Sequence, residues 1–161
     1  MDVSSFPDGI YLVDFEFHPA HGREGNPPKP VCMVVREWPS GATMRHWQGD
    51  LECMDTPPFP TGSSALFVAY YASAELDCFH VLGWVPPVNV LDLFAEFRCL
   101  TNGKRLSHGS GLLGALLYFS LPSISGEEKD SMRDLVLTGG PWIEAEQTAI
   151  LDYCATDVVA L

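Results

Sequence analysis

The run YLVDFEF, from Tyr11 to Phe17, sets two acids among the apolar residues of a strand that reads as buried. Residues two apart in a strand point to the same face of a sheet, so the carboxylates of Asp14 and Glu16 are expected side by side. Ionised carboxylates are costly to bury unless they are paired or bind a metal ion. The run therefore predicts either a strand with one face toward solvent or a divalent-metal site, and a metal site needs further acids from elsewhere in the chain.

Strand and helix patterns alternate along the rest of the chain. Four more apolar segments predict strands: VCMVVREW, ATMRHWQ, ALFVAYY and VNVLDLF. Five segments predict helices: SAELDCFHVLGW, ending near Gly83; LFAEFRCL, from Asp92 or just beyond it; GSGLLGALLYFSL; SGEEKDSMRDLVL, opened by the capping-box pair Ser125 and Glu128; and a last helix that begins at Pro141. HPAHGREGNPPKP and DTPPFPTGSS are rich in glycine and proline and predict loops. This order indicates a single α/β domain over residues 1–161, with a mixed five-stranded sheet flanked by helices and a helical C-terminal half.

Charge and cysteine content limit the partners and the compartment. The chain carries a net charge of −12 with only nine basic residues. This balance excludes the broad cationic surface that duplex DNA requires, so a nucleic-acid contact is expected to be local, at a short single-stranded segment or an end. The five cysteines are scattered and form no CxxC pair, which argues against a zinc site or disulfide framework and favours a reducing, cytoplasmic location. The sequence shows no signal peptide and no membrane-spanning run, so a soluble protein is expected.

The last predicted helix carries a third acid at a position expected to face the apolar core. Tyr153 and Asp157 are four residues apart and therefore neighbours on one helical face. The same face carries Ile150, Cys154 and Leu161, so Asp157 lies on the apolar side of the helix. Asp157 is either a surface acid beside a core tyrosine or a partner for the two acids of the first strand.

Taken together, these motifs resemble those of the DEDD 3′–5′ exonucleases of the DnaQ-like, ribonuclease H-like superfamily. Asp-x-Glu stands in the first strand, an acid opens the helix after the fourth strand, and Tyr-x-x-x-Asp stands in the last helix. The tyrosine spacing resembles the subgroup that contains ribonuclease D and the proofreading domain of polymerase I-type (family A) DNA polymerases of bacteria and phages. The resemblance covers Tyr11 to Leu161 and implies a ribonuclease H-like fold.

Two residues compete for the acid of the second motif. Placing Glu75 there keeps the spacing to Gly83 that the resemblance implies, and its neighbours at i+3, i+4 and i+7 are apolar (Cys78, Phe79, Leu82). Asp77 has the more amphipathic neighbours His80, Val81 and Trp84. The two side chains point in nearly opposite directions on a helix, so we prefer Glu75 and keep Asp77 as the alternative.

The resemblance implies a two-metal-ion phosphodiester hydrolysis. Asp14, Glu16, Glu75 and Asp157 would hold two Mg²⁺ or Mn²⁺ ions, roughly 3.5–4 Å apart, which activate a water and stabilise the leaving 3′ oxygen. Tyr153 would orient that water. The expected substrate is the 3′ end of single-stranded DNA, and the expected partner is a DNA polymerase domain or subunit.

Several further residues have two interpretations. Asp92 is either the N-cap of the following helix or, as the resemblance implies, an indirect support that holds the metal ligands in place. Phe17 and Tyr70 or Tyr71 either stack on terminal bases or belong to the core. His18 and His21 are interpreted as solvated loop histidines.

Two other functions remain open at this stage. One is a ribonuclease D-like exonuclease that acts on RNA ends. The other is a non-catalytic module that binds a single-stranded 3′ end or packs on a polymerase.

Overall fold

The computed structural model describes residues 3–18, 27–122 and 126–161. Its centre is a five-stranded sheet with the strand order β3-β2-β1-β4-β5. β1 pairs with β2 and β2 with β3 in antiparallel fashion, whereas β4 is parallel to both β1 and β5. The strands are β1 Ile10–His18, β2 Lys29–Trp38, β3 Thr43–Trp47, β4 Leu66–Ala69 and β5 Val90–Asp92.

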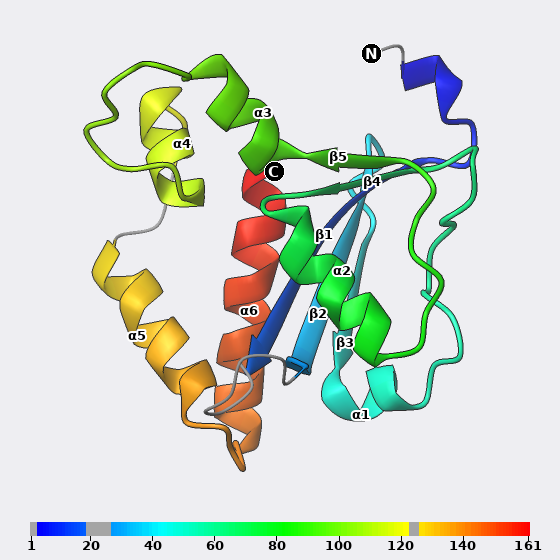
Figure 1. Cartoon of the computed structure of the whole chain (residues 1–161). Coiled ribbons are helices and arrows are strands. Elements are labelled where there is room, and N and C mark those ends of the chain that lie inside the picture. Colours follow the sequence, from blue (N-terminus) through cyan, green and yellow to red (C-terminus); the bar gives the residue numbers. More distant parts are fainter. Residues whose placement is uncertain (1–2, 19–26, 123–125) are drawn as a thin grey trace.

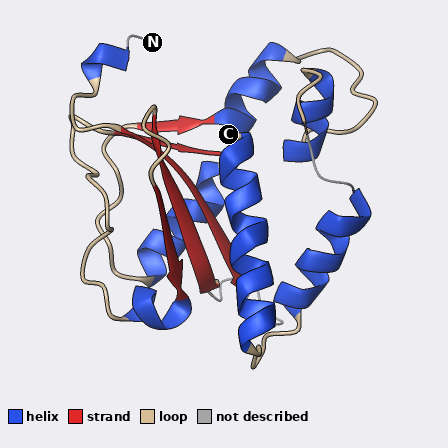
Figure 2. Ribbon diagram, turned by 180° about the vertical axis from the view of Figure 1, so that it is seen from behind, coloured by secondary structure: helices blue, strands red, loops and turns tan. Residues whose placement is uncertain are grey.

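Helices flank both faces of this sheet (Figures 1 and 2). α2 lies across one face and α6 across the other, and α5 lies beside α6. The α-helices are α1 Gln48–Glu52, α2 Ala72–Val81, α3 Leu93–Leu100, α4 Leu112–Tyr118, α5 Gly126–Leu137 and α6 Glu144–Ala160, and a 3₁₀ turn spans Val3–Ser5. The expected fold class, a mixed five-stranded α/β sheet with a helical C-terminal half, is confirmed, and its strand order and directions are consistent with a ribonuclease H-like fold.

The sheet separates two cores because alternate side chains of β1 and β2 point to opposite faces. On the α2 face, Phe15 of β1 packs in an aromatic cluster with Phe79 and Trp84. On the α6 face, Val34 of β2 packs with Ile150 of α6 and other apolar residues. Asp14 and Glu16 alternate with Phe15, so the strand period places them on the α6 face.

Some element boundaries differ from those expected. The last helix begins at Glu144 rather than at Pro141, because the Glu146 carboxylate accepts the Ile143 N–H at 2.9 Å and so caps the helix three residues later. α1 was not expected, because its five residues are too few to show a helical period. The loop predicted before β2 ends earlier than expected, since Lys29 already lies in the strand.

Two other expectations lie partly outside the described residues. Residues 19–26 hold the rest of the predicted loop, including His21, and Ser125 of the predicted capping box falls in 123–125. Among the helices that the structure describes, none has both the length and the apolar character needed to cross a bilayer.

Candidate metal centre

The acidic site lies on the part of β1 that extends beyond the last residue paired with the parallel strand β4. β4 pairs with β1 only from Ile10 to Leu12. Asp14 and Glu16 follow directly, opposite Val34 and Cys32 of β2, and the register shifts between Glu16 and Phe17. Both carboxylates therefore project from β1 beyond the end of its ladder with β4, on the face that α6 covers.

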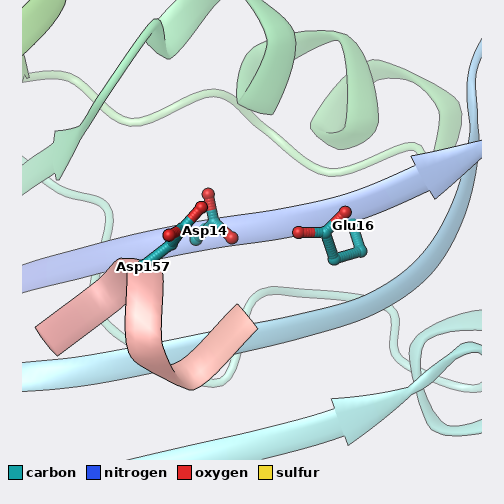
Figure 3. Close-up of side chains that lie close together, drawn as sticks. All are labelled: Asp14, Glu16 and Asp157. Carbon is teal, nitrogen blue, oxygen red and sulfur yellow. The ribbon is translucent and has the colours of Figure 1, made fainter. Parts of the chain in front are cut away.

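α6 brings the third acid to the same point. Asp157 lies with Tyr153 on the side of α6 that faces the sheet, beside the fully buried Cys154 and Val158. Figure 3 shows the side chains of Asp14, Glu16 and Asp157 at this point. One carboxylate oxygen from each lies within 4.8 Å of the other two, and all three residues are partly buried. The structure thus brings together residues that are more than 140 positions apart in the sequence.

The three carboxylates repel one another in a poorly solvated place. Burial and the neighbouring Asp157 raise the pKa of Asp14 from 3.8 to about 7. Burial, and next the Asp14 charge, raise the pKa of Glu16 well above its ordinary value. The fold therefore places these carboxylates close together without enough nearby positive charge to neutralise them.

A divalent ion fits this donor set. Hard cations such as Mg²⁺ prefer carboxylate oxygens, and two oxygens on opposite sides of Mg²⁺ lie about 4.2 Å apart. Three carboxylates that already lie within 4.8 Å of one another need only small side-chain adjustments to share one ion. An ion there would also relieve the repulsion between Asp14 and its neighbours, which is the property that distinguishes a metal site from a chance group of surface acids.

Glu75, not Asp77, is the acid of α2 that faces the sheet. Glu75 is 4% exposed, and its Oε2 accepts the backbone N–H of Phe15 at 2.8 Å. Asp77 is exposed. Burial, followed by the Asp14 charge, raises the pKa of Glu75 well above its ordinary value, so the two carboxylates interact even though Glu75 does not belong to the cluster of three. Its role as a ligand stays a prediction.

Tyr153 lies next to the acids with its ring largely buried. The residue is 8% exposed, and burial together with the Asp157 charge raises the pKa of its hydroxyl well above 10.0. The phenol therefore stays protonated at neutral pH and is available as a hydrogen-bond donor beside the carboxylates.

Two contacts of the cluster were missed by sequence reasoning. Lys129 of α5 forms an ion pair with Asp157, with 2.7 Å between Nζ and Oδ2. Cys154 donates from Sγ toward Asp14, whose Oδ2 lies 3.2 Å away. Lys129 stands three residues before Met132 and seven before Val136, which pack in the core against α6, so the helical period contained the signal for its position.

The structure shows the surroundings of Asp92, Phe17 and His18. Asp92 caps α3, because its Oδ1 accepts the N–H of Phe94 at 2.9 Å, and it also accepts the Tyr71 N–H at 3.1 Å. Phe17 is partly buried and packs against the core on the α2 face. The interpretation of His18 as a solvated histidine is wrong, since it is 9% exposed and its Nε2 lies 3.0 Å from the Leu137 carbonyl oxygen.

The two neighbouring tyrosines have different surroundings. Tyr70 donates its hydroxyl to the Ser110 carbonyl at 2.5 Å and is partly buried. Tyr71 is 51% exposed and places its ring edge against Phe94, with ring centres 5.0 Å apart. Base stacking by Phe17 or Tyr71, and indirect support of the metal ligands by Asp92, stay predictions.

An apolar cavity of about 520 Å³ opens beside Asp157. α4 and the segment after it line one side with Leu116, Leu121 and Pro122, and the end of α6 lines the other with Val159. A volume in this range suits a small organic ligand. The cavity therefore places apolar surface next to the carboxylates.

Neither a scan against protein-family models nor a search of curated proteins gave a match. The assignment of function consequently depends on the fold and on the chemistry of the site. Both support a ribonuclease H-like arrangement with an acidic cluster able to bind a metal ion.

Proposed function

We propose that this protein is a metal-dependent 3′–5′ exonuclease that hydrolyses the last phosphodiester bond of a single-stranded DNA end. The observation that carries the proposal is the meeting of Asp14, Glu16 and Asp157 within 4.8 Å at the end of the β1–β4 ladder. Glu75 adds a fourth carboxylate that interacts with this cluster. The strand order of the sheet supports the same assignment.

Divalent ions, when bound, would supply Lewis-acid activation of a water and stabilisation of the leaving oxygen. Asp14, Glu16 and Asp157 would hold the metal, with Glu75 as the additional ligand. Glu75 also fixes the site mechanically, because its hydrogen bond to the Phe15 N–H ties α2 to the strand segment between the two β1 acids.

Tyr153 is suited to orient the attacking water. Its hydroxyl is kept protonated by burial and by the surrounding carboxylates, so it can donate one hydrogen bond and accept another. Its position one helical turn before Asp157 keeps it beside the metal ligands.

Charge and shape favour a single-stranded end over a duplex. A chain with a net charge of −12 offers no extended basic surface for a double helix. The apolar cavity next to Asp157 gives the terminal nucleotide a place to lie against Leu116 and Leu121. Proofreading in association with a DNA polymerase follows from the resemblance alone and remains a prediction.

The proposal is tested with a single-stranded DNA oligonucleotide labelled at its 5′ end. In Mg²⁺ or Mn²⁺ we expect a ladder of products shortened from the 3′ end, which disappears in EDTA and in Asp14→Asn or Asp157→Asn. Asp77→Asn, which changes an exposed acid of α2, is the matched control and should cleave at the wild-type rate.

Two outcomes would redirect the proposal. Cleavage of an RNA oligonucleotide but not of the DNA version would favour the ribonuclease D-like alternative. Metal-dependent binding of the oligonucleotide without any cleavage would contradict the enzyme and support the non-catalytic module.

A further inference from the structure

Lys129 reaches the acidic cluster because α5 packs on α6. Met132 and Val136 of α5 lie in the core against Ile150 and Cys154 of α6. Lys129 stands on the same side of α5, one turn before Met132, so the packing that buries these apolar residues also directs the lysine toward α6. Its side chain is 28% exposed, which is unusually low for a lysine on a surface helix.

The ammonium group has two contacts that hold it at the cluster. Nζ lies 2.7 Å from Oδ2 of Asp157, whose side chain is only 13% exposed. It also lies 5.6 Å from the centre of the Tyr153 ring, a cation–π distance. The Lys129 charge lowers the pKa of both Asp14 and Glu16 against the opposing effects of burial, so it acts on all three carboxylates.

A charge count then gives the consequence. Asp14, Glu16 and Asp157 carry three negative charges when ionised. Glu75 lies outside this cluster, with Oε2 on the Phe15 N–H, so in this count it supports β1 and does not serve as a metal ligand. Lys129 supplies one positive charge, and one divalent ion supplies the other two. We propose that Lys129 takes the part of a second divalent ion, so that the cluster binds one metal ion per chain; this inference rests on the proposed function and changes its metal count.

The limited space around Asp157 and the repulsion between like charges also disfavour a second divalent ion beside Lys129. A divalent ion bound to Oδ2 of Asp157 would lie about 2.1 Å from that oxygen and therefore no more than about 5 Å from the ammonium nitrogen. Like charges that close repel strongly in a partly buried site. Lys129 already occupies Oδ2 of Asp157, so a second ion would have to displace the ammonium group to bind that oxygen.

The test is the number of Mn²⁺ ions bound per chain. It is measured by isothermal titration calorimetry and by loss of the electron paramagnetic resonance signal of free Mn²⁺. We expect one ion for the wild-type chain and for Lys129→Arg, which keeps the charge, and two ions for Lys129→Met. Lys104→Met is the matched control, because Lys104 also lies over a tyrosine ring, Tyr118, with 5.7 Å from Nζ to the ring centre, and donates to its hydroxyl instead of to a carboxylate. This control should bind one ion.

Two ions bound by the wild-type chain would overturn the inference, as would one ion bound by both the wild-type chain and a folded Lys129→Met. A wild-type count of two overturns the inference even if Lys129→Met does not fold; in that case Lys129→Gln, which also removes the charge, is counted in its place and should bind two ions. Failure of the proposed function would be recognised separately. Two bound ions with oligonucleotide cleavage refute only the role of Lys129, whereas one bound ion without cleavage refutes only the exonuclease.

Discussion

Replacement of Asp14 by asparagine should make the metal-free protein more stable at high pH. The asparagine side chain would keep the shape of the aspartate and an oxygen that can accept from the Cys154 thiol, which lies 3.2 Å from Oδ2 of Asp14. It would remove a charge that burial and Asp157 make unfavourable. An acid whose pKa rises on folding contributes stability that is present below its unfolded pKa and lost as the pH rises through its folded pKa.

The magnitude follows from the pKa of Asp14. Folding raises it from 3.8 to about 7. At about 1.4 kcal/mol per pKa unit, the raised pKa lowers the free energy of unfolding by about 4 kcal/mol at pH 8 and by less than about 2 kcal/mol at pH 5, where Asp14 stays protonated in the folded state. We therefore expect Asp14→Asn to raise the free energy of unfolding by up to about 4 kcal/mol at pH 8 in EDTA, and by less than half of that at pH 5.

Urea denaturation followed by circular dichroism measures this difference. Saturating Mn²⁺ should reduce it, because an ion at 100 times its Kd stabilises the wild-type chain by about 2.7 kcal/mol and binds the variant poorly. Asp77→Asn controls for loss of a negative charge in general and should change the free energy of unfolding by less than about 0.5 kcal/mol. An Asp14→Asn protein that is no more stable than wild type at pH 8 in EDTA would refute the electrostatic description of the cluster.

Three further predictions concern the core, a helix cap and the tyrosine beside the acidic cluster. Phe79→Ala should lower the free energy of unfolding by about 3–5 kcal/mol in urea denaturation, because the ring is fully buried among aromatic neighbours; a loss below about 1 kcal/mol would contradict the packing. Asp92→Ala should cost about 1 kcal/mol through loss of the α3 cap and leave Mn²⁺ affinity unchanged, whereas a roughly tenfold or greater loss of affinity in calorimetry would support a role in holding the metal ligands instead. Tyr153→Phe should reduce the cleavage rate about 100-fold or more while Mn²⁺ binding persists, and unchanged cleavage would exclude the tyrosine from water orientation.

The acids of β1 and α6 could be predicted because their positions depend on local geometry. A period of two places Asp14 and Glu16 on one face of a strand, and a spacing of four places Tyr153 and Asp157 on one face of a helix. The same reasoning chose Glu75 over Asp77 as the residue that faces inward, and the burial of the two side chains agrees with it. What each acid does with a metal ion stays a prediction.

The packing of helices on the sheet determines contacts between distant elements, which local sequence periodicity cannot predict. The ion pair between Lys129 and Asp157 joins residues 28 positions apart, and the contact of His18 with Leu137 spans 119 positions. A local pattern shows which side of a helix is apolar, but not which residues of another element will meet it. The sequence by itself therefore determined the fold class and the acids that point inward. The tertiary structure decided that the acids of β1 and α6 meet beyond the end of the β1–β4 ladder and that Lys129 of α5 joins them there. Only the packing of α5 and α6 on the sheet sets the distances between these side chains.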